Sequence, residues 1–175
     1  MTLPPNPQEQ AAALRSLQRP LKDRYRADPD TARQTSTATA HVLVDAVAAE
    51  VPQWSGSARA GLHPATGGDG TEACSGDMLL EALAGCAGVT LRSVAVAMGI
   101  ALRSATVHVV GHWDARGTLG VDRETPVGFT DIEVSIEVDA DADEAALERL
   151  VSLTERYCVV AQTLQAPTPV SVSRR

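Results

Sequence analysis

The longest apolar segment of the chain lies near its middle, at residues 78–98, where only two charged residues interrupt nonpolar and small ones. A helix that is apolar on all sides is normally buried, so this pattern predicts a central helix. Ser75 is expected to cap it, with Asp77 placed favourably in the first turn. Gly99 is expected to end it.

Alternating polar and apolar residues predict strands on both sides of this helix. In residues 129–139, Ile132, Val134, Ile136 and Val138 share one face, and polar or acidic residues occupy the other. Such alternation is typical of an antiparallel strand with one exposed face. Residues 45–50 fit no single element. Further strands are expected at residues 34–44, 54–62, 105–113 and 118–121, with a short last strand around Val170 and Val172.

A second, amphipathic helix is expected after Asp141, which together with Glu144 resembles a capping box. Strand runs separated by helices predict an α+β fold rather than a doubly wound parallel sheet. The inward face of this second helix is expected to carry Leu147, Leu150, Val151, Thr154 and Cys158.

Residues 1–33 differ from the rest because they are polar and rich in proline. We interpret them as an N-terminal arm that lies on the domain or on a partner subunit, and residues 34–175 as the main domain. Helix-forming residues predict a helix from Gln8 to Arg19 within the arm. Pro20 is expected to end it.

The formal net charge of −7 argues against binding to nucleic acid or to an anionic membrane surface, because both require a cationic face. The N-terminus has neither the basic nor the apolar region of a secretory signal. No stretch of eighteen uncharged apolar residues predicts a membrane span. The sequence therefore predicts a soluble cytoplasmic protein.

The all-apolar helix at residues 78–98 also favours a homodimer, in which two such helices cover each other.

Three cysteines, Cys74, Cys86 and Cys158, form no structural disulfide framework. Cys86 lies within the apolar helix between two nearby glycines, and it is either a small core residue or a reactive thiol. Cys158 also faces inward, so the two thiols can form a transient disulfide if the two helices meet. Cys74 has no identifiable partner, which favours an incidental thiol.

The other candidate motifs predict no site. The glycine-rich segment 65–76 lacks the ending of a phosphate loop and the spacing of a dinucleotide loop. His108 and His112 are separated by about 13 Å along a strand and cannot share a metal. No cysteine and histidine spacing is typical of zinc, and no nucleophile elbow occurs, so no metal is expected.

Two segments together resemble the OsmC/Ohr superfamily of osmotically inducible and organic hydroperoxide resistance proteins. These are Leu-Leu-Glu-Ala-Leu-Ala-Gly-Cys, which ends at Cys86, and Tyr-Cys-Val-Val-Ala-Gln-Thr-Leu, which contains Cys158. The resemblance covers residues 34–173. It implies an OsmC-like α+β fold with antiparallel sheets around long buried central helices, and an intertwined homodimer with cysteine peroxidase sites at the subunit interface.

The resemblance further implies that Cys86 is the peroxidatic cysteine and Cys158 the resolving cysteine. Peroxidase members carry a glutamate ten residues before the first cysteine, where this chain has Gly76, so Asp77 is the nearest carboxylate. Arg59 is the best candidate for the arginine that the family supplies from an N-terminal strand. Asp77 lies about 13 Å before Cys86 along the helix, so it is expected to approach Cys86 of an antiparallel partner helix.

The leading hypothesis is a thiol peroxidase that reduces organic hydroperoxides in oxidative stress defence. An apolar pocket formed by Leu79, Leu83 and Val89 is expected to hold the alkyl group. No bound cofactor is expected, and an external dithiol donor, such as a lipoyl group or thioredoxin, is expected to restore the enzyme. The alternatives are a non-catalytic OsmC-like dimer that binds a small apolar ligand and a structural dimer with two core thiols.

Overall fold

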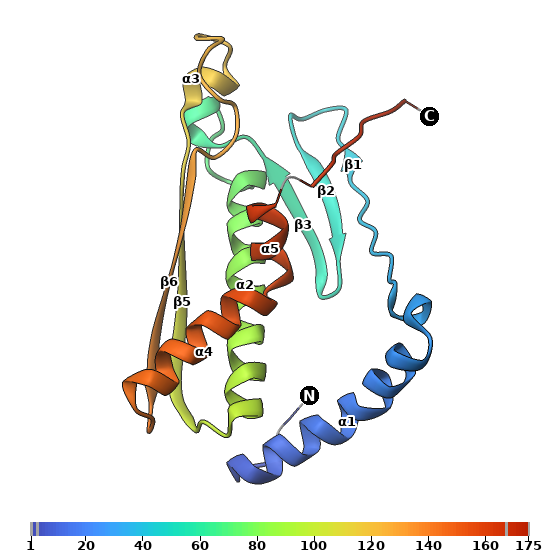
Figure 1. The fold of residues 1–175 in the computed structure, drawn as a ribbon. Helices are drawn as coiled ribbons and strands as arrows, with labels where there is room; N and C mark the ends of the chain where they lie inside the picture. Colours follow the sequence, from blue (N-terminus) through green and yellow to red (C-terminus); the bar gives the residue numbers. More distant parts are fainter. Residues whose placement is uncertain (1, 3, 167, 175) are drawn as a thin grey trace. The chain divides into compact units, whose positions relative to one another are not determined.

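The computed structural model of the protein describes residues 2, 4–166 and 168–174. The chain folds into two compact units. The first comprises residues 1–33, 83–108 and 135–175, and the second comprises residues 34–82 and 109–134. One long helix and two long strands contribute residues to both units (Figure 1).

The central helix α2 spans Ser75–Met98, so Ser75 lies within the helix rather than capping it from outside. Gly99 follows with a φ of 75°, a left-handed conformation that glycine adopts without strain. The expected helix and its end are therefore confirmed. Buried residues recur at every fourth position on one side of the helix, at Leu83, Ala87, Leu91 and Ala95.

The chain covers only part of α2, although the sequence predicted a helix buried on all sides. Val89 is 74% exposed and Leu79 is 37% exposed. By length and composition α2 is also apolar enough to span a membrane, and only 28% of its most apolar window is buried. An apolar helix face that is exposed in one chain is normally covered by a binding partner.

The core of the first unit forms where α2, two strands and a helix meet. Strands β5 (Leu102–His112) and β6 (Asp131–Ala140) form a two-stranded sheet (Figure 1). Helix α4 (Glu144–Tyr157) begins after Asp143, which accepts a hydrogen bond from the Ala146 N–H at 2.8 Å, so Asp143 is the cap rather than Asp141. The buried cluster consists of Leu91, Ala95, Ile100 and Leu150.

The second unit contains a four-stranded sheet of β1 (His41–Val42), β2 (Ala49–Gln53), β3 (Gly56–Gly61) and β4 (Ala73–Cys74). Neighbours pair antiparallel except β3 and β4, which are parallel with Ala60 opposite Ala73. A 3₁₀ turn, η2 (Pro64–Thr66), lies between them in the chain.

Three of the expected strands are wrong or much shorter than predicted. Of residues 34–44 only His41 and Val42 form a strand, because β propensity alone does not extend a strand. Residues 118–121 form no strand, and the helical turn α3 (Ala115–Thr118) occupies the start of this segment. The expected last strand around Val170 and Val172 is also absent from residues 168–174.

Helix α1 (Pro7–Ala27) shows that Pro20 does not end the arm helix as expected. Asn6 caps it by accepting the N–H of Gln8 at 2.8 Å. Pro20 removes one backbone hydrogen bond, but Ser16 and Pro20 are both exposed, so water can reach the unpaired carbonyl. The 3₁₀ turn η1 (Pro29–Ala32) follows. The Arg92 guanidinium donates to Gln10 Oε1 at 2.7 Å and connects α1 to α2.

We predict that Leu150→Ala lowers the free energy of unfolding by about 2–5 kcal/mol, because a fully buried side chain leaves a cavity. The matched control is Leu17→Ala on α1, where the side chain is 58% exposed and the change should stay within about 0.5 kcal/mol. Urea unfolding measures both. Equal effects would contradict the position of the core.

Candidate active site

The structure brings Cys86 and Cys158 close enough for each side chain to shift the pKa of the other. Both are free thiols. Cys86 lies half-buried on α2, and Cys158 is 1% exposed. From the sequence, proximity of these two cysteines was expected only if the two helices met. In the structure the two helical segments bring them close to each other.

Cys158 lies at a break between two helices, where the sequence suggested one continuous helix. Helix α4 ends at Tyr157, and α5 (Val159–Gln165) begins after Cys158, whose ψ of 108° is extended. The buried Thr154 hydroxyl donates to the Leu150 carbonyl at 2.8 Å, a local bond that often bends helices. Figure 1 shows that the chain changes direction between α4 and α5.

The side chain of Gln162 stabilises this break. Its Nε2 donates to the Glu155 carbonyl at 3.1 Å, which is one of the carbonyls left unpaired at the end of α4. Its backbone N–H donates to the Cys158 carbonyl at 2.9 Å and closes the first turn of α5. Sequence reasoning missed Gln162, and no pattern in the sequence separates it from an ordinary exposed glutamine.

The break leaves the first backbone N–H groups of α5 free to act on the Cys86 thiol, and those of Val160 and Val159 lower its pKa. These groups have no partner within their own helix, and they carry the positive end of its dipole. Burial raises the pKa of the Cys86 thiol. Hydrogen bonds from the Val160 N–H, the Cys158 thiol, the Val159 N–H and the Thr90 hydroxyl outweigh burial, so the net pKa lies below its ordinary value.

The Val160 N–H makes the largest contribution that lowers the pKa of Cys86, and the Cys158 thiol makes the next. The thiolate is the nucleophilic form of cysteine, so a lower pKa increases the reactive fraction at neutral pH.

The pKa of Cys158 moves in the opposite direction. Burial raises it first, and the hydrogen bond to Cys86 and the negative charge on the Cys86 thiolate raise it further, against the N–H groups of Ala161 and Val160. The two thiols therefore titrate as a pair, in which Cys86 loses its proton first and Cys158 keeps its own. Opposite shifts in two neighbouring groups are typical of a nucleophile and its proton-bearing partner.

Arg59 lies in the second unit, where it forms an ion pair with Glu72. Parallel pairing places Ala60 opposite Ala73, so the preceding residues, Arg59 and Glu72, are neighbours. Gly61 accommodates the Glu72 side chain, because a Cβ at Gly61 would lie 2.9 Å from the Glu72 Cβ. Sequence reasoning missed Glu72, since only the strand register identifies it.

The remaining predicted residues all lie on α2, and they differ in how far their side chains are exposed to solvent. Asp77 is exposed in the first turn. Leu83 and Val89 lie three residues before and after Cys86, but Leu83 is only 2% exposed and belongs to the buried side of α2, whereas Val89 is open to solvent. Leu79 lies one turn before Leu83 and is partly open. Their role in holding a substrate stays a prediction.

Three exposed side chains of the second unit could hold a metal ion. His112 on β5 and Asp131 and Glu133 on β6 bring their ligand atoms within 4.8 Å of one another. Exposed acidic groups often cluster in this way without an ion. We therefore assign no metal to them.

Comparison with known proteins identifies the class to which this fold and cysteine pair belong. Residues 68–173 match the family model described as OsmC-like protein. This match covers more than half of the chain, so the chain belongs to the OsmC-like family, as the two cysteine segments indicated.

Solved structures show the same α+β fold. An OsmC-like protein from Mycoplasma pneumoniae is 19% identical with a TM-score of 0.64, and the match covers 77% of this chain and 89% of that one. An organic hydroperoxide resistance protein OsmC from Legionella pneumophila is 18% identical with a TM-score of 0.59, covering 75% and 90%. None of the curated proteins compared matches the sequence.

We predict that Cys158→Ala raises the pKa of Cys86, because it removes the S–H donor. Cys158→Ser is the matched control, since its O–H can still donate, and it should raise the pKa less. The pH dependence of Cys86 alkylation by iodoacetamide, followed by peptide mass spectrometry, measures this. Identical profiles for Ala, Ser and wild type would show that the thiol contact does not affect Cys86.

Proposed function

We propose that the protein is a thiol-dependent peroxidase that reduces organic hydroperoxides. The observation that carries this proposal is the contact between a half-buried thiol of lowered pKa and a buried thiol of raised pKa. Membership in the OsmC-like family and structural likeness to organic hydroperoxide resistance proteins support a role in redox stress.

In the first step the Cys86 thiolate attacks the terminal oxygen of the hydroperoxide. An S–O bond forms, the O–O bond breaks, and the alkoxide takes up a proton to leave as an alcohol. Cys86 becomes a sulfenic acid. The N–H groups of Val159 and Val160 favour the thiolate before the attack.

In the second step Cys158 resolves the sulfenic acid. Its sulfur attacks the sulfur of Cys86, an S–S bond forms, and water leaves. The two side chains already affect each other's pKa, which supports a short path between the sulfurs. An external dithiol, such as a lipoyl group or thioredoxin, then reduces the disulfide and is itself oxidised.

The open apolar side chains near Cys86 suit either an alkyl group or a second subunit. Val89 on α2 is 74% exposed, and Val159 at the start of α5 is 71% exposed. We infer that a second copy of the chain covers the open side of α2, and that the Arg59–Glu72 pair and Asp77 serve the partner's cysteine pair.

Light scattering at micromolar concentration tests the dimer, and we predict the mass of two chains. Val89→Glu places a charge on the uncovered side of α2 and should shift the population toward the monomer. Leu119→Glu is the control, because Leu119 is also exposed but lies away from α2 in the sequence. A wild-type monomer would contradict the dimer.

Peroxide consumption with dihydrolipoamide as electron donor tests the chemistry. Cys86→Ser should abolish turnover, because the nucleophile is gone. Cys158→Ser should allow a single turnover and leave a sulfenic acid on Cys86 that dimedone traps and excess peroxide over-oxidises. Cys74→Ser is the control and should behave as wild type. If Cys86 does not react with cumene hydroperoxide or tert-butyl hydroperoxide, the peroxidase proposal is rejected and the non-catalytic dimer is favoured.

A further inference from the structure

The second unit contains a cavity of about 270 Å³ that shares no residue with the cysteine pair. It lies between the end of β3 with η2, the start of α2, and the segment from the end of β5 to the start of β6. A volume near 300 Å³ is at the lower end for sites that bind small molecules. The residues that define its chemistry are His63, Cys74, Asp77, Trp113, Thr118 and Phe129.

Aromatic rings form much of the wall. The chain has one phenylalanine and two tryptophans, and this cavity is lined by the phenylalanine and one tryptophan. The His63 ring meets the Trp113 ring edge to face, with centroids 5.2 Å apart. Both Trp113 and Phe129 are half-buried, so each presents part of its ring to the cavity. Edge-to-face and offset contacts between rings are the arrangements that aromatic groups prefer.

Two glycines make room for the ring of Phe129. A Cβ at Gly111 would lie 2.6 Å from Phe129 Cε1, a distance that real contacts do not reach. A Cβ at Gly76 would lie 3.4 Å from Phe129 Cζ and 3.6 Å from the Cys74 sulfur. Glycine at these two positions is therefore what allows the ring to lie close to the backbone.

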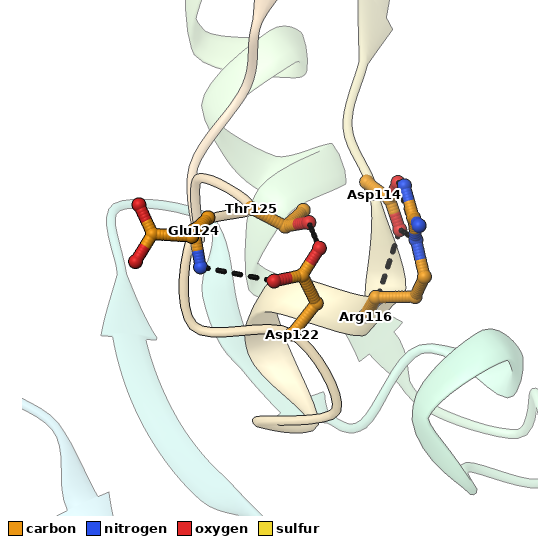
Figure 2. Close-up of polar contacts among 5 residues, drawn as sticks. All are labelled: Asp114, Arg116, Asp122, Glu124 and Thr125. Carbon is orange, nitrogen blue, oxygen red and sulfur yellow. Dashed lines mark hydrogen bonds and ion pairs between the residues drawn. The ribbon is translucent and has the colours of Figure 1, made fainter.

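The loop that carries Phe129 is closed by local hydrogen bonds, which Figure 2 shows. Asp114 accepts the Arg116 N–H at 2.9 Å and holds the Arg116 guanidinium. Asp122 accepts the Glu124 N–H at 3.0 Å and the Thr125 hydroxyl at 2.8 Å. These contacts fix a preformed wall, so a ligand would not need to order the loop on binding.

The polar groups that line the cavity favour a neutral ligand over an anionic one. Asp77 is the acidic residue on the wall, and it already occupies the positive end of α2. An anionic ligand would meet this carboxylate, whereas a hydroxyl can donate to it. His63 Nδ1 accepts the Ala65 N–H at 3.0 Å, so a neutral His63 carries its proton on Nε2.

We propose that this cavity is a binding site for a small neutral phenol, with the ring against Trp113 and Phe129 and the hydroxyl toward Asp77. A cavity of about 150 Å³ is known to hold benzene, so the space is sufficient for one substituted ring. The inference does not depend on the cysteine pair, because neither Cys86 nor Cys158 lines the cavity; Asp77 is the lining residue that the proposed peroxidase site also uses.

Trp113 provides a direct reporter. Trp54 is fully exposed, so Trp54→Phe leaves Trp113 as the one tryptophan. We expect phenol to change the fluorescence of this variant in a saturable manner. Trp113→Phe, which keeps Trp54, should show only collisional quenching. Benzoate, with the same ring and a negative charge, should bind about tenfold more weakly than phenol, and Asp77→Asn should reduce that difference.

Three further measurements keep the test independent of folding defects. In the unmodified chain, phenol should slow alkylation of Cys74 and leave that of Cys86 unchanged. Phe129→Ala should weaken phenol binding about tenfold. Cys86→Ser should bind phenol normally, so loss of the peroxidase function and loss of this site are distinguishable. A Trp113 signal that does not saturate, equal affinity for phenol and benzoate, or unprotected Cys74 would overturn the proposal.

Discussion

The site depends on one interruption in the backbone, the helix break at Cys158. Without it, the N–H groups of Val159 and Val160 would be used within a continuous helix and could not reach Cys86. With it, they lower the pKa of Cys86 while Cys158 stays buried. Burial and the neighbouring Cys86 raise the pKa of Cys158, so the two thiols shift in opposite directions.

The large elements could be predicted because they follow directly from residue patterns. The apolar run at residues 78–98 predicted α2, and the alternation at residues 129–139 predicted β6 within two residues at its start. The break at Cys158 could not be predicted, because neither glycine nor proline marks it. It depends on Thr154 and Gln162, whose hydrogen bonds to nearby carbonyls compete with a continuous helix.

The candidate site was likewise only partly visible in the sequence. Both cysteines could be found from their segments and from the family resemblance, whereas the partner of Arg59 could not. Glu72 is close to Arg59 because β3 and β4 run parallel in one register, and a glycine at position 61 leaves space for its side chain. The source of the Cys86 pKa shift also depends on tertiary contacts, since Thr90 is near in sequence but Val159 and Val160 are not.

The central claim is that Cys86 and Cys158 act as one redox pair, and the disulfide formed by one equivalent of organic hydroperoxide tests it most directly. Non-reducing peptide mapping by mass spectrometry should find a Cys86–Cys158 bond within one chain, with Cys74 still free. A Cys74–Cys86 bond, a bond between chains, or oxidation that spares Cys86 would contradict the account.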